Sequence, residues 1–139
     1  TADDNLAGTL EPGATSPSAR FEAMRKLAKA GILTGVTMMP ILPFLEDDLE
    51  NIRQIVRTAA DCGASYIIPA FGMTLRSGSR EYYYQELDHL DPGVKEKYLQ
   101  AFGDSYQCSA PNWRQLDEVF QEEISNGNIR LKIPVFAPE

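Results

Sequence analysis

The stretch that decides the fold runs Ile32-Leu33-Thr34-Gly35-Val36-Thr37-Met38-Met39-Pro40. It is short, apolar and rich in β-branched residues, and a proline ends it, which is typical of a strand buried on both faces. A second stretch of the same kind follows at residues 65–71, Ser65-Tyr66-Ile67-Ile68-Pro69-Ala70-Phe71. The sequence therefore predicts two buried strands.

An amphipathic helix precedes each of these strands. Ser16 is a favourable N-cap and Pro17 suits the first helical position, and apolar residues then recur at helical spacing as far as Gly31. Acidic residues 46–48 favour the positive N-terminal end of the next helix, whose apolar stripe continues to Gly63. Helices that alternate with short apolar strands predict βαβ units with a parallel sheet.

The remaining segments carry weaker patterns. Residues 1–15 lack apolar periodicity and are predicted to form a loop, as is the polar stretch 76–80. Helices are expected to begin near Glu81, Asp91 and Pro111, and residues 129–133 alternate as an edge strand or a loop would. We therefore expect two βα units in residues 1–75 and a helical C-terminal extension in residues 76–139.

Two βα units do not close a parallel sheet, because such sheets are covered on both faces and their barrels need more strands. The predicted fold class is accordingly α/β, as the C-terminal portion of a partial (βα) barrel with a helical extension. The missing units would precede Thr1, and a chain that opens on threonine agrees with this expectation. The N-terminal half of the same barrel is then the first expected partner.

Composition excludes several functional classes. The chain has 139 residues, of which 43% are hydrophobic and 24% charged, as in soluble globular proteins. A net charge of −7 argues against general binding to duplex nucleic acid. Cys62 and Cys108 lack metal-ligand spacing, no apolar run reaches the roughly 20 residues that cross a bilayer, and no signal peptide is visible. A reducing cytoplasmic location without membrane contact is expected.

A resemblance to a known family is carried by residues 1–4, 10–17, 20–24, 30–32 and 35–43. They include the run Glu11-Pro12-Gly13-Ala14-Thr15-Ser16-Pro17 and then Arg20-Phe21-Glu22-Ala23. This pattern resembles the radical S-adenosylmethionine superfamily, in its spore photoproduct lyase-like branch, often labelled DNA repair photolyase. In the proteins of this branch, a segment of this form joins the fourth barrel strand to the helix that follows it. The resemblance is strongest over residues 1–75 and weaker beyond them.

This resemblance implies a partial (βα) barrel with a four-iron, four-sulfur cluster on a CxxxCxxC loop near the N-terminus of the full protein. The cluster would cleave S-adenosylmethionine reductively to a radical that abstracts hydrogen from a substrate. No CxxxCxxC motif occurs in this chain. We therefore expect no metal ligand and no catalytic residue here, and we expect the 139 residues alone to be inactive.

The resemblance also implies positions that contact S-adenosylmethionine. Thr1 and Asp3 fall at the end of the family's fourth strand, and Glu11 and Arg20 follow at the junction with the helix. The planar fork of Arg20 matches the methionine carboxylate. The expected contacts on the fifth and sixth strands are Gly35, Thr37, Met39 and Ile68. Pairing of Arg20 with Glu11, a solvated chain start and plain core packing are the structural alternatives.

A cluster of arginines and tyrosines is the candidate substrate site, comprising Arg76, Arg80, Tyr82 and Tyr84. Consecutive helical residues point about 100° apart, so at least one of the three tyrosines 82–84 should face solvent or a cleft. Arginine beside an exposed aromatic suits an anionic or planar substrate, either a small molecule or a flipped base. The alternative is that Tyr83 and Leu87 pack on the barrel and the rest lie on the surface.

Two functions remain open from the sequence. The first is the C-terminal part of a radical S-adenosylmethionine enzyme, which contributes to cofactor and substrate binding for hydrogen abstraction. The alternative is a non-catalytic, stand-alone binding or interaction module derived from such a barrel. Because its sheet lacks neighbours, the isolated half-barrel is expected to expose apolar surface or to dimerise through its sheet edge. An aldolase-type barrel would need a lysine or metal ligands on the strands, and residues 32–40 and 65–71 contain none.

Overall fold

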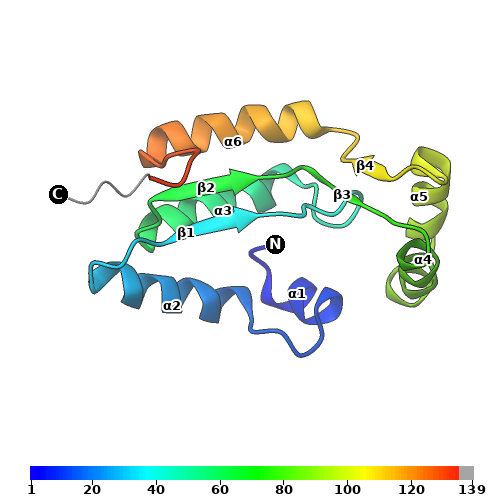
Figure 1. Ribbon diagram of the computed structural model, residues 1–139, viewed down its shortest axis with the longest axis horizontal. Coiled ribbons are helices and arrows are strands. Elements are labelled where there is room, and N and C mark those ends of the chain that lie inside the picture. The colour runs from blue at the N-terminus through cyan, green and yellow to red at the C-terminus, as the bar shows by residue number, and fades with distance from the viewer. Residues whose placement is uncertain (135–139) are drawn as a thin grey trace.

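Two parallel strands form the centre of the molecule in the computed structural model, which describes residues 1–134 (Figure 1). Strand β1 (Gly35–Met38) pairs with β2 (Tyr66–Pro69), with Gly35 opposite Tyr66 and Thr37 opposite Ile68. The predicted parallel pair is confirmed, and both strands are shorter than the apolar runs that predicted them. The protein is therefore of the mixed α/β class.

Six helices and a second strand pair complete the described chain. The helices are α1 (Asp4–Leu10), α2 (Pro17–Lys29), α3 (Leu49–Asp61), α4 (Ser79–Leu90), α5 (Val94–Phe102) and α6 (Trp113–Gly127). Strands β3 (Gly72–Thr74) and β4 (Gln107–Ser109) pair antiparallel. Residues 1–134 form two two-stranded sheets and no closed barrel.

Local capping explains where the first two helices begin. The Ser16 hydroxyl accepts a hydrogen bond from the Ala19 amide, and Pro17 occupies the first helical position, as predicted for α2. The prediction of a loop over residues 1–15 was wrong for residues 4–10. There the Asp3 carboxylate accepts from the amides of Asn5 and Leu6, at 2.7 and 3.1 Å, and caps a short helix.

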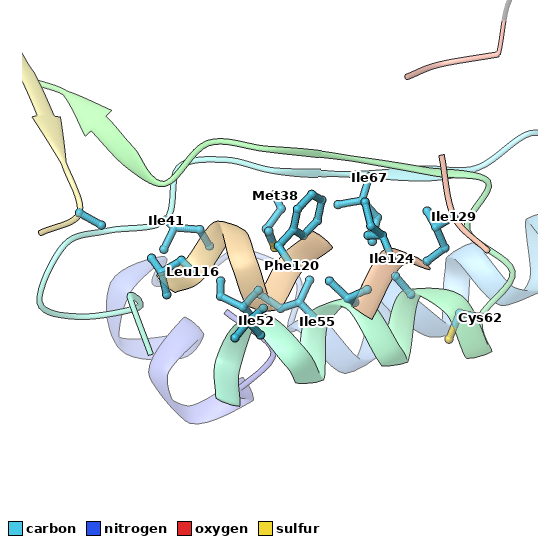
Figure 2. Close-up of a cluster of buried hydrophobic side chains, with 14 of the residues drawn as sticks. Met38, Ile41, Ile52, Ile55, Cys62, Ile67, Leu116, Phe120, Ile124 and Ile129 are labelled. Atoms are coloured by element: carbon cyan, nitrogen blue, oxygen red, sulfur yellow. The ribbon is translucent and has the colours of Figure 1, made fainter. Parts of the chain in front are cut away.

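Helices α3 and α6 cover one face of the parallel sheet. Figure 2 shows Met38 and Ile67 on the strands pointing toward Ile52 of α3 and Phe120 of α6, within one buried cluster. The opposite face, which carries Gly35, Thr37 and Met39 by strand alternation, lacks such a cover (Figure 1). The core therefore lies on one side of β1 and β2, and the other side is open.

Helix α6 belongs to this core and leads back to the sheet. After it, the Arg130 carbonyl accepts from the Ile67 amide at 2.9 Å, and the Arg130 amide donates to the Ser65 carbonyl at 3.2 Å. Arg130 and Tyr66 thus form an isolated parallel β-bridge. Residues 129–133 are otherwise a loop. The arrangement repeats the strand, helix, strand order of the preceding unit.

Residues 72–110 form an insertion between β2 and α6. Its side chains build a second buried cluster around Leu87 and Tyr98, against Phe44 of the loop after β1. It lies beyond the carboxyl ends of β1 and β2 (Figure 1). Helix α6 packs in the first cluster with α3, and the second cluster is built mainly by residues 73–108.

The described residues contain no helix that is long and apolar enough to cross a bilayer.

Candidate functional site

A cavity of about 730 Å³ lies between helices α1 and α2 and strand β1. Its volume falls within the roughly 300–1,000 Å³ range of small-molecule sites. Polar groups line it at the carboxyl end of β1, and apolar side chains of α2 line it toward the start of that strand. This is the candidate functional site.

Six of the eight residues that the sequence nominated for cofactor binding line this cavity. They are Thr1, Glu11, Arg20, Gly35, Thr37 and Met39. Asp3 and Ile68 do not line it. Asp3 caps α1 instead, and Ile68 lies half-buried on β2, opposite Thr37.

Arg20 and Glu11 form an ion pair at the mouth of the cavity, with Arg20 Nη2 donating to Glu11 Oε2. Both side chains are about half exposed. Exposed ion pairs of this kind contribute about 0–1 kcal/mol, so little free energy holds the two groups together. A ligand with its own carboxylate or ammonium group can replace either partner at small cost.

Thr1 is fixed beside the carboxyl end of β1 by two residues that the sequence did not single out. Its backbone nitrogen donates to Glu46 Oε1 at 3.0 Å, and its hydroxyl donates to Asn51 Oδ1 at 3.1 Å. Glu46 is 7% exposed and also accepts from the Leu42 amide at 3.0 Å. The sequence predicts Glu46 only as one of the acidic residues at the start of a helix, and it lies before α3 instead.

Gly35 makes room for an aromatic ring. A Cβ added at this position would lie 2.5 Å from ring carbons of Tyr66, its neighbour across the strands. Tyr66 lines the cavity, although sequence reasoning did not nominate it. A glycine and an aromatic residue in adjacent predicted strands were the available signal, but only the register shows that they face each other.

Thr37 and Met39 have exposed side chains, whereas Met38 between them is buried. This alternation agrees with the prediction that Gly35, Thr37 and Met39 share one face. That face is the open one, so both side chains are accessible at the carboxyl end of β1.

The four candidate substrate residues fall into two groups, and none of them lines the cavity. Arg80 donates from Nη2 to the carbonyls of Leu75 and Asp104, and Tyr84 is buried with its hydroxyl donating to the Gly103 carbonyl at 3.0 Å. Tyr82 is 66% exposed, and Arg76 is also exposed. The predicted exposure of at least one tyrosine is confirmed at Tyr82.

Tyr83 packs inside the insertion together with Tyr84 and Leu87, and not on the parallel sheet as the structural alternative had it. Its hydroxyl and that of Tyr98 lie 3.0 Å apart, and their rings meet edge to face. Burial raises the pKa of Tyr83 to about 12 and raises the pKa of Tyr98 as well. Both phenols are therefore neutral near pH 7 and stabilise the insertion.

No group of three or more histidine, cysteine or acidic side chains is placed to hold a metal ion in the part of the chain that the structure describes. Cys62 and Cys108 are both buried. Cys62 Sγ accepts from Arg25 Nη2 at 3.2 Å, and burial raises the pKa of the Cys108 thiol. These residues do not supply ligands for a four-iron cluster.

Comparisons with known proteins find relatives without an established function. An uncharacterized protein of Acidianus two-tailed virus is 33% identical over 89 residues, which is 62% of this chain and 29% of that protein. An uncharacterized protein of Mycobacterium tuberculosis is 28% identical over 100 residues, or 72% of this chain and 29% of the relative. The matches thus span 29% of the length of these curated relatives. No family model and no solved structure matches the chain.

Proposed function

We propose that this chain is the C-terminal portion of a radical S-adenosylmethionine enzyme, in which it contributes to cofactor and substrate binding for hydrogen abstraction. The observation that carries the proposal is the cavity beside β1. Six residues nominated from the sequence for cofactor contact line it, from α2, β1 and the segments that flank α1 and β1. Ligands of parallel α/β sheets bind at the carboxyl ends of the strands, where the polar part of this cavity lies.

The polar groups of the cavity suit the amino-acid part of S-adenosylmethionine. Arg20 offers a planar guanidinium for a carboxylate, and Glu11 offers an acceptor for an ammonium group. The ring of Tyr66, which lies across Gly35 at the start of β1, offers an aromatic surface toward the other end of the cavity. Bound there, the cofactor would supply radical chemistry, and the role of this chain is to orient it.

An iron–sulfur cluster does not fit the residues of this chain, which has two buried and separate cysteines. The cluster ligands would come from the N-terminal half of the barrel, which is the proposed partner. The insertion would carry the substrate side, with Tyr82 and Arg76 as its exposed polar and aromatic groups. The free cysteines of this chain, and the iron–sulfur cluster proposed for the N-terminal half of the barrel, favour a cytoplasmic location.

Calorimetric titration of S-adenosylmethionine into the protein as its gene encodes it tests the proposal. Arg20→Ala removes the proposed carboxylate partner, and Lys29→Ala removes a positive charge from the same helix outside the cavity lining. Hydrogen bonds to charged groups contribute about 1.5–3 kcal/mol, so Arg20→Ala should weaken binding by roughly 10- to 100-fold. Equal affinities of the two variants, or no binding by the unaltered protein, would refute the proposal.

The alternative function is a non-catalytic interaction module. Exposed apolar side chains at both edges of the parallel sheet favour it, including Leu33 near β1 and Ile133 near β2. This alternative predicts that no cysteine triplet is encoded upstream of Thr1. A coding sequence with such a triplet favours the enzyme instead.

A further inference from the structure

We propose that Phe44 is a positioning residue, through which the insertion of residues 72–110 holds the polar end of the cavity in its binding shape. The ring of Phe44 packs against the insertion, and its backbone belongs to the loop that lines the cavity. The packing of the insertion therefore sets the fraction of molecules whose cavity is ready to bind. This inference rests on the proposed function only in taking S-adenosylmethionine as the ligand.

The first observation is the turn that follows β1. Leu42 and Glu46, at its two ends, both line the cavity. The Glu46 amide donates to the Leu42 carbonyl at 2.9 Å, and the Leu42 amide donates to Glu46 Oε2 at 3.0 Å. Asn51 Nδ2 donates to the Glu46 carbonyl at 2.8 Å. These bonds close residues 42–46 into one compact turn, so a backbone change inside the turn moves its cavity-lining ends.

The second observation is the backbone conformation of Phe44, in the middle of this turn. Its φ of +62° lies in the left-handed region, where a Cβ crowds the neighbouring carbonyl and a bulky side chain is disfavoured. The other non-glycine residue of the described chain with a positive φ is Asn128, a residue type that commonly ends a helix in this way. An aromatic residue keeps such a conformation only where its surroundings hold it.

The insertion supplies the contacts that hold Phe44. The ring of Phe44 meets that of Tyr98 edge to face with centroids 5.5 Å apart, and its centroid lies 6.0 Å from that of Phe102. Aromatic pairs in this geometry attract each other beyond the burial of their surface. Among the described residues that pack against the buried cluster of the insertion, Phe44 and Leu45 are the two that come from outside it. The contact therefore links the insertion to the turn.

The competing explanation is that Phe44 only fills the core of the insertion. Two substitutions separate the explanations. Phe44→Ala removes the ring and keeps a Cβ, so the left-handed backbone is strained and no longer held. Phe44→Gly removes both, and glycine adopts this conformation without strain. If packing alone matters, glycine should serve the cavity no better than alanine, because it fills less space. If the ring positions the turn, glycine should restore the cavity without help from the insertion.

Calorimetric titration of S-adenosylmethionine into the protein as its gene encodes it tests the inference. The left-handed conformation of alanine is costly enough to reduce the population of the native turn roughly five- to thirtyfold, and apparent affinity falls with that population. Phe44→Ala should weaken binding by this factor, whereas Phe44→Gly should bind like the unaltered protein.

A second pair of variants tests the role of the insertion itself. Phe102→Ala removes a ring that Phe44 contacts, so it should weaken binding in the presence of Phe44 and have no effect in the Phe44→Gly background. Leu90→Ala is the matched control, because Leu90 packs against the same cluster and is not an aromatic partner of Phe44. It should leave the affinity unchanged.

Amide hydrogen exchange at Glu46, measured without S-adenosylmethionine, reports the turn independently of the ligand. This amide donates to the Leu42 carbonyl within the turn. Its exchange should accelerate in Phe44→Ala by the same factor as binding weakens, and it should return to the rate of the unaltered protein in Phe44→Gly.

Equal affinities of Phe44→Ala and Phe44→Gly would overturn the inference, as would exchange at Glu46 that glycine does not restore. Equal weakening by Phe102→Ala and Leu90→Ala would also overturn it, because the cavity would then respond only to the general stability of the insertion. If Phe44→Ala fails to fold, Phe102→Ala with and without Phe44→Gly decides the question. The expected exchange pattern in a protein that binds no S-adenosylmethionine would refute the proposed function alone. Equal binding by all variants with unchanged exchange would refute the positioning role alone.

Discussion

Replacing Gly35 with alanine distinguishes a packing role for this glycine from a ligand-binding one. The added Cβ would lie 2.5 Å from ring carbons of Tyr66, which is far inside van der Waals contact. The ring or the strand must therefore move. Overpacking of this kind costs about 1–3 kcal/mol. In a strand without the clash, alanine in place of glycine would instead stabilise by roughly 0.5–1 kcal/mol.

The expected result is therefore a change of sign between two backgrounds. In the unaltered chain, Gly35→Ala should lower the free energy of unfolding by about 0–2.5 kcal/mol, the difference between those two effects. In a Tyr66→Ala background the ring is absent, and the same substitution should stabilise the protein slightly. Neighbours in contact show coupling of about 0.5–3 kcal/mol, which is large enough to measure.

Urea unfolding of the four proteins, followed by circular dichroism and by the fluorescence of Trp113, gives the required free energies. If the slope of the unfolding free energy against urea concentration is the same in all four proteins, the shift in the midpoint urea concentration gives the change in stability directly. Equal effects of Gly35→Ala in both backgrounds would refute the reasoning, because Tyr66 would then not be what the Cβ meets. In that case the glycine would be free to serve a ligand, as the sequence had suggested.

Three further outcomes follow from the buried groups. Arg57 donates to Glu123 at 2.6 and 2.8 Å and lowers the pKa of that carboxyl, so Glu123→Gln should cost about 1 kcal/mol at pH 7. The stability that the ionised Glu123 contributes is present above the pKa of this carboxyl in the unfolded chain and is lost as pH falls through its pKa in the folded chain. The free energies of unfolding of the unaltered protein and of Glu123→Gln should therefore converge as the pH is lowered. Burial raises the pKa of Tyr83 to about 12, so the free energy of unfolding should decline between about pH 10 and 12. The ionisation of Tyr83 can be followed by ultraviolet absorbance, and Tyr98→Phe, which removes the hydrogen-bond partner of Tyr83, should shift the pKa found in that titration. Phe120→Ala, at a fully buried site between the helices and the sheet, should cost about 3–5 kcal/mol in thermal unfolding.

Features with a local cause could be predicted from the sequence. Ser16 and Pro17 define the start of α2, and the apolar run ending at Pro40 defines β1, because capping and strand composition depend on neighbouring residues. Helix α1 was missed because its signal is one cap, Asp3, without apolar periodicity. Strands β3 and β4 have three residues each and depend on a distant pairing, so they left no pattern to read.

The site was predictable in its positions but not in its contacts. Strand alternation placed Gly35, Thr37 and Met39 on one face, which the burial pattern bears out. The register that sets Tyr66 across Gly35, and the fold that brings Thr1 to Glu46, join residues far apart in the chain. Such contacts depend on tertiary packing, which composition and spacing do not encode.

Electron paramagnetic resonance of the anaerobically purified and reduced protein, as its gene encodes it, tests the central claim most directly. The account predicts the signal of a reduced four-iron cluster, and it predicts that the signal changes when S-adenosylmethionine is added. A protein that shows no such signal after supply of iron and sulfide, or whose signal is unaffected by saturating S-adenosylmethionine, would contradict the account.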